Sequence, residues 1–134
     1  TQMSEDMPAL ILLWPVLDTK ELAARRFHAE ELSDRLGQPG FEEIDGHKIG
    51  LKLIGEMWNT DLPRFFPKIK IPVLVLHGVQ DSVSPVEHLD LIRSGFRTKR
   101  IEITTYQDGT HGLPQPNHRK YAHYHILQFL KKYA

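Results

Sequence analysis

Two unbroken apolar runs, ALILLW at residues 9–14 and IPVLVL at residues 71–76, are the most regular segments of the chain. Runs of this kind are typical of parallel strands that are covered on both faces. A third segment, RIEITTY at residues 100–106, alternates apolar and polar positions, which predicts a more exposed strand near the edge of a sheet. Segments with helical spacing follow all three. The pattern predicts an α/β protein with three parallel strands and right-handed crossovers.

Capping residues predict where the helices between these strands begin. Asp18 is the expected N-cap of a helix over about residues 20–36, and Ser84 is the expected N-cap of a second helix. The last helix is expected to begin near Asn117 and to continue almost to the C-terminus. The order of elements is therefore strand, helix, strand, helix, strand, helix.

Residues 38–67 interrupt this alternation with an irregular and partly apolar segment. The Asp45-Gly46 step predicts a small hairpin, and a short helix follows it. We interpret the segment as a cap-like insertion over a binding site, within one partial domain that spans residues 1–134. The alternative is an insertion that only packs on the core. Three aromatic residues are candidates for a substrate-binding acyl pocket, although core packing explains them equally well: Trp58, Phe65 and Phe66.

Composition narrows the class of protein. The 134 residues are 40% apolar and 25% charged with a formal net charge of +0, which fits a globular domain and gives no sign of binding to nucleic acid or an anionic membrane. The absence of cysteine excludes disulfides and thiolate metal sites and favours a cytoplasmic setting. No apolar run approaches the roughly 20 residues of a membrane span.

An acid and a histidine each follow a predicted strand. Asp81 comes after the strand at residues 71–76, and His111, within DGTHGL, comes after the next one. Parallel strands bring their carboxyl ends to the same edge of a sheet, where ligands bind. An aspartate there can accept the Nδ1 proton of a histidine and prepare the ring for base catalysis. Gly109 and Gly112 would give the histidine loop backbone freedom. Taken alone, each residue is an ordinary loop residue.

Four segments together resemble the C-terminal part of an α/β-hydrolase: PALILLWPVLD, EEIDGHKIG, KIKIPVLVLHGVQDSVSP and DGTHGL. The chain is most similar to small-capped serine esterases of the feruloyl-esterase or monoacylglycerol-lipase kind. The resemblance implies that Asp81 is the acid of a catalytic triad and that His111 is its general base. It also implies a small carboxylic-ester substrate and no metal or organic cofactor, although a thioester or a small peptide or amide is equally compatible with these residues.

The nucleophile of such a triad has no counterpart in the sequence. A G-x-S-x-G segment, which would precede Asp81 and His111 in chain order, does not occur. We therefore expect the C-terminal half of a serine hydrolase that is inactive by itself, with the nucleophile elbow and oxyanion-hole loop upstream of Thr1. The alternative is a truncated or split product that acts only in binding or assembly. A sheet cut in this way would leave residues 9–14 with an unpaired edge, which predicts self-association or a partner chain that supplies the missing sheet.

Other residues allow weaker interpretations. Asp18 also follows a strand and is a second candidate for the acid, but helix capping explains it adequately. His118, His123 and His125 do not have the i, i+4 spacing of a metal pair on one helical face, so a solvated helix surface is expected there instead.

Overall fold

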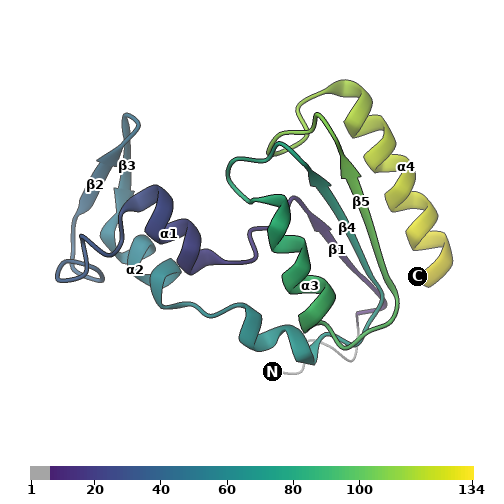
Figure 1. Ribbon diagram of the computed structural model, residues 1–134, viewed down its shortest axis with the longest axis horizontal. Coiled ribbons are helices and arrows are strands. Elements are labelled where there is room, and N and C mark those ends of the chain that lie inside the picture. Colours follow the sequence, from purple (N-terminus) through teal and green to yellow (C-terminus); the bar gives the residue numbers. More distant parts are fainter. Residues whose placement is uncertain (1–6) are drawn as a thin grey trace. The chain divides into compact units, whose positions relative to one another are not determined.

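The computed structural model describes residues 7–134, which divide into two compact units (Figure 1). The first, called here the sheet unit, contains the segment up to Leu17 together with Pro63–Ala134. The second, called here the hairpin unit, is Asp18–Leu62. Each unit has its own elements and is described separately below.

The sheet unit is built on the three predicted strands, which are β1 (Leu10–Leu13), β4 (Val73–Gly78) and β5 (Ile101–Tyr106). They form a parallel sheet in the order β1-β4-β5, so the prediction of three parallel strands is confirmed. Every residue of β4 is buried, whereas β5 is mostly half-buried, as the alternating pattern of its sequence indicated. Of the two unbroken apolar runs, the one at residues 71–76 forms the central strand, and the one at residues 9–14 forms β1 beside it.

Both faces of the central strand are covered. Leu74 and Leu76 pack in a cluster with Phe129 and Ala122 of α4 (Pro116–Tyr133), the helix that runs along the sheet in Figure 1. Side chains alternate along a strand, so Val73 and Val75 point to the other face, and both are also fully buried.

No helix in the described part of the chain is long and apolar enough to cross a membrane.

The helical segment before β5 begins differently from the prediction. It consists of a 3-10 turn, η2 (Val86–His88), that leads directly into α3 (Leu89–Gly95), and no side chain caps either element. The prediction that Ser84 is the N-cap was wrong. The Ser84 hydroxyl donates instead to the carbonyl oxygen of Pro15, 2.6 Å away and 69 positions earlier in the chain. The hydroxyl group that the local sequence pattern predicted to cap the helix therefore forms a tertiary hydrogen bond instead.

The hairpin unit contains α1 (Thr19–Phe27), β2 (Phe41–Ile44), β3 (His47–Gly50) and α2 (Leu51–Asn59). The predicted hairpin is confirmed, because β2 and β3 pair antiparallel around Asp45 and Gly46, which both have positive φ (51° and 77°). Positive φ at both central positions is the geometry of a type I′ turn, which Asp-Gly favours.

Helix α1 begins as predicted but ends early. The Asp18 carboxylate accepts a hydrogen bond from the backbone N–H of Glu21 at 2.8 Å, which is an N-cap. His28 then takes a left-handed conformation (φ 50°) and stops the helix, which had been expected to reach residue 36. The compact unit includes α1 and ends at Leu62, so its limits differ from the insertion predicted at residues 38–67. The capping role expected for that insertion stays a prediction.

Candidate active site

Asp81 lies in the turn that follows β4, and its own carboxylate holds that turn closed. One oxygen, Oδ1, accepts hydrogen bonds from the backbone N–H groups of Val83 and Ser84, both at 2.8 Å. The Asp81 N–H donates back to the carbonyl oxygen of Gly78. The side chain is fully buried. The turn therefore fixes the direction of the second carboxylate oxygen, Oδ2, which takes no part in these bonds.

His111 meets that second oxygen from the loop between β5 and α4. Its Nδ1 lies 2.8 Å from Asp81 Oδ2. A carboxylate only accepts hydrogen bonds, so Nδ1 carries the proton and Nε2 of the neutral ring keeps its lone pair. The His111 side chain is 37% exposed while the Asp81 side chain is 0% exposed. This arrangement gives a histidine that is oriented on one side and accessible on the other.

Two glycines allow the two loops to approach this closely. A Cβ added to Gly78 would lie 2.5 Å from the carbonyl carbon of Gly109, and closer still to its oxygen. A Cβ on Gly109 would lie 3.0 Å from the Gly78 Cα. The Gln80 N–H also donates to the Gly109 carbonyl at 2.9 Å. Gly109 thus provides space rather than the backbone freedom expected from sequence, whereas Gly112 does have positive φ (80°).

A second aspartate–histidine pair lies where this loop leads into α4, and it was not predicted from the sequence. His118 Nε2 is 2.9 Å from Asp108 Oδ1, and His118 Nδ1 is 3.1 Å from Gln115 Oε1. Its side chain is only 13% exposed, so the expectation of a solvated surface is wrong for His118. A signal was present, since His118 continues the apolar stripe of Ala122, Ile126 and Phe129 at helical spacing.

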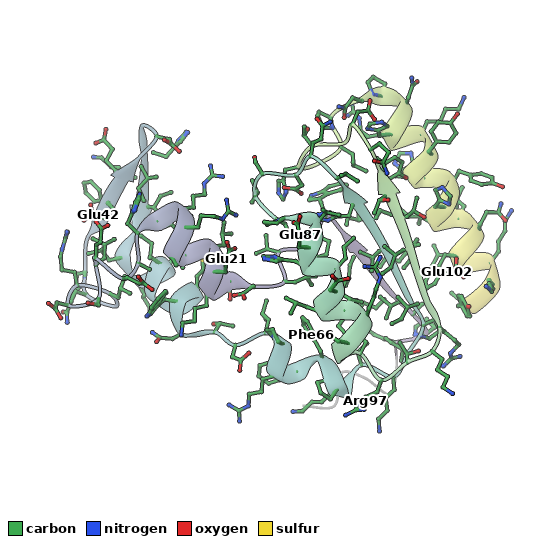
Figure 2. All side chains as sticks on the ribbon, in the orientation of Figure 1. Glu21, Glu42, Phe66, Glu87, Arg97 and Glu102 are labelled. Carbon is green, nitrogen blue, oxygen red and sulfur yellow. The ribbon has the colours of Figure 1, made fainter. Side chains whose placement is uncertain are left out.

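The three predicted substrate-binding aromatics lie on two elements, η1 of the sheet unit and α2 of the hairpin unit. Phe66, in the 3-10 helix η1 (Pro63–Lys68), is buried against the ring of Phe96 at 4.9 Å between centroids. Figure 2 shows Phe66 near the end of α3, beside Arg97, where β4 and β5 begin rather than where they end. Phe65 is half exposed on η1, and Trp58 lies on α2 of the hairpin unit.

The remaining candidates have structural partners or lie on the surface. Asp18, the alternative acid, caps α1 as described above. His123 is exposed, and the ring of His125 packs edge-to-face on Tyr124. Within residues 7–134, no three histidine, aspartate or glutamate side chains are grouped so that they could hold a metal ion.

Comparisons of the sequence with protein-family models and with curated proteins find no match. Solved structures do match. Esterase Est1E from Butyrivibrio proteoclasticus is 21% identical with a TM-score of 0.71, over 94% of this chain and 51% of that one. Mouse alpha/beta hydrolase domain-containing protein 10 is 18% identical with a TM-score of 0.71, over 92% and 52%. A monoacylglycerol lipase from Paleococcus ferrophilus is 21% identical with a TM-score of 0.59, over 88% and 44%.

The chain thus spans about half the length of the solved structures that it matches. At these identities the likeness establishes the fold. The parallel sheet of β1, β4 and β5 with its helices corresponds to the later part of those structures. The chain has the fold of the C-terminal part of an α/β-hydrolase, as its sequence motifs indicated.

Proposed function

We propose that Asp81 and His111 are the acid and the base of a serine hydrolase that acts on carboxylic esters, with the nucleophile supplied from outside these 134 residues. One observation carries the proposal. A fully buried carboxylate, satisfied by two backbone donors, holds Nδ1 of a partly exposed histidine at 2.8 Å. The pair lies where two adjacent parallel strands end, which is where this class of fold binds ligands.

The geometry suits a histidine that moves a proton in both directions. Nε2 of His111 removes the proton of a serine hydroxyl as the oxygen attacks the ester carbonyl, and the ring becomes an imidazolium that the Asp81 carboxylate stabilises. The imidazolium then gives this proton to the departing alkoxide, which leaves an acyl-enzyme. Water, activated by the same Nε2, hydrolyses the acyl-enzyme and regenerates the serine.

The proposed substrate class draws on the solved structures that share the fold. They include Est1E with ferulic acid bound, a metagenome-derived lipolytic enzyme and a monoacylglycerol lipase. The names of these proteins describe lipases and lipolytic enzymes or a bound ferulic acid, which supports an ester as the substrate here. The roles of Trp58 and Phe65 in binding its acyl group remain part of the proposal, whereas the burial of Phe66 against Phe96 favours a core role for that ring.

The proposal is tested by hydrolysis of p-nitrophenyl acetate with and without a nucleophile. Removing the serine of a triad costs on the order of a millionfold in turnover, so the 134-residue chain alone should hydrolyse the ester no faster than buffer. When an upstream hydrolase half that contains the G-x-S-x-G elbow and the oxyanion-hole loop is supplied, joined before Thr1 or as a separate chain, hydrolysis should appear. His111→Gln should then abolish it, while His123→Gln on the exposed face of α4 should not. Activity that survives His111→Gln would refute the proposal.

A role in assembly is the second candidate, and the edge of β1 supports it. Within the described residues β1 pairs only with β4, so its other edge has no neighbouring strand. The N–H groups of Leu10 and Trp14 donate to the carbonyl oxygens of Pro72, just before β4, and Leu76, within β4. Because N–H directions alternate along a strand, that of Leu13 points to the open edge. We propose that a strand of another chain, or of a second copy, pairs there.

Light scattering of purified chain tests this second candidate. Association is expected, and Leu13→Pro should remove it without removing a bond to β4. Exposed Leu53 on α2 provides a control, because Leu53→Pro lies outside the sheet unit and should leave association intact. A stable monomer at high concentration would contradict the assembly role.

A further inference from the structure

His77 is a buried histidine that the proposed reaction does not use. It occupies the penultimate position of β4, its side chain is almost inaccessible (1% exposed), and its Nε2 lies 2.8 Å from the carbonyl oxygen of Ser84. A carbonyl oxygen only accepts hydrogen bonds, so Nε2 is the protonated nitrogen. Nδ1 is then a bare acceptor, and it is buried without a hydrogen-bond partner among residues 7–134.

Ser84 is the point at which three segments are tied together. Its N–H donates to Asp81 Oδ1 at 2.8 Å, its hydroxyl donates to Pro15 O at 2.6 Å, and its carbonyl accepts from His77. Ser84 is fully buried. The bonds therefore connect the last residues of β4, the acid turn and the segment after β1. A shift of Ser84 would move a donor that holds the Asp81 carboxylate in place.

We infer that His77 is a positioning residue for the acid: its Nε2–H holds the Ser84 carbonyl, and through Ser84 it fixes the direction in which Asp81 Oδ2 faces His111. This inference rests on the proposed function. The unpaired Nδ1 supports it, because burying an acceptor without a partner is unfavourable and an apolar side chain would suit the interior better. What the histidine ring adds, compared with an apolar side chain, is the Nε2–H donor that binds the carbonyl oxygen of Ser84, seven residues later in the chain.

The test uses the 134-residue chain and nuclear magnetic resonance of its ¹⁵N-labelled histidines. In the wild type, His77 should be the neutral Nε2–H tautomer, and the Nδ1 proton of His111 should be protected from exchange with water. His77→Leu removes the donor. His77→Gln keeps one, because the glutamine amide nitrogen reaches the position of Nε2. His123→Leu, on the exposed face of α4, is the matched control.

Exchange of the His111 Nδ1 proton in the folded protein should become about tenfold faster in His77→Leu, as expected for the loss of one hydrogen bond, and should remain near the wild-type rate in His77→Gln and His123→Leu. A merely structural role would lower stability without changing this rate in the folded state. A protected wild-type proton that His77→Leu leaves unchanged would overturn the inference alone. A wild-type proton without protection would instead contradict the Asp81–His111 pair, and the inference with it.

The design remains decisive if His77→Leu does not fold. In that case the wild-type tautomer and His77→Gln carry the test. An Nδ1–H tautomer of His77, which could not donate to Ser84, would overturn the inference, as would a His77→Gln protein whose His111 proton exchanges as fast as in Asp81→Asn.

Discussion

The loop from Tyr106 to α4 contributes one residue to each of two aspartate–histidine pairs: His111 pairs with Asp81 of the turn after β4, and Asp108 pairs with His118 of α4. The two pairs have nearly equal lengths, but the more buried partner is the acid in the first and the histidine in the second. In the first, Asp81 is 0% exposed and His111 is 37% exposed, with 2.8 Å between Oδ2 and Nδ1. In the second, Asp108 is 75% exposed and His118 is 13% exposed, with 2.9 Å between Oδ1 and Nε2. The distance between acid and base therefore does not distinguish them.

The difference lies in which partner keeps a free position. His111 uses Nδ1 for Asp81, and its side chain is 37% exposed. Both nitrogens of His118 face oxygen acceptors, from Asp108 and Gln115, and its ring packs on Tyr106. A histidine with both nitrogens engaged cannot take a proton from a substrate, but it can fasten the end of a loop. The pair with the buried acid, Asp81–His111, is therefore the one that suits the proposed chemistry. The pair with the less exposed histidine, Asp108–His118, instead anchors the start of α4.

The largest effect is expected from closing the space that brings the first pair together. In Gly78→Ala the new methyl group would collide with the backbone of Gly109, and backbone cannot rotate away as a side chain can. We expect the free energy of unfolding to fall by about 3 kcal/mol, the upper range for overpacking, together with loss of the protected His111 proton. Urea denaturation measures the free energy of unfolding, and nuclear magnetic resonance measures the protection of the His111 Nδ1 proton.

Gly50→Ala is the control for that substitution. A Cβ at Gly50 meets nothing within 4 Å and its φ is −64°, so its cost should stay below about 1 kcal/mol. If Gly78→Ala were as mild as Gly50→Ala, close approach of the two loops would not be what positions the pair.

Replacing each acid by its amide separates the two pairs directly. Asp81→Asn places an amide where three donors converge on a buried carboxylate, so unfolding free energy should drop by about 2 kcal/mol. Asp108→Asn alters a contact with His118 whose carboxylate faces water, and should cost about 0.5 kcal/mol or less. Urea denaturation of both variants at neutral pH gives the comparison. Equal losses would mean that burial of the acid does not distinguish the pairs.

The smallest effect concerns Tyr106, beside the second pair. Burial raises the pKa of the Tyr106 hydroxyl above its usual value of 10.0. A raised pKa in the folded state means a contribution to stability that is complete below pH 10 and is lost as the pH rises through the folded-state pKa. Stability should therefore fall more steeply above pH 10 in the wild type than in Tyr106→Phe.

Alkaline denaturation curves of these two proteins measure that difference. The hydrogen bond to Glu102 raises the pKa of Lys132 and gives a trend of the same sign, but it is present in both proteins and cancels between them. Parallel curves would show that the Tyr106 hydroxyl titrates as it does in the unfolded chain.

Much of the fold and the two central residues of the candidate site could be predicted from sequence, because they depend on local patterns and on one topological rule. Apolar runs identify strands, Asp-Gly identifies the hairpin turn, and Asp18 identifies the start of α1. Parallel strands end at one edge, so Asp81 and His111 had to follow neighbouring strand ends once the strand order was right.

Only the tertiary structure decided which polar groups are partners across long separations. The Ser84 hydroxyl could cap a helix by its local sequence, but it bonds to Pro15 because folding brings that carbonyl within reach. The same holds for the crossing of Gly78 over Gly109 and for the burial of His118 against Tyr106. Sequence periodicity states which face of an element is buried, whereas a hydrogen bond or a steric limit between distant residues exists only after the backbone has placed them within a few ångströms.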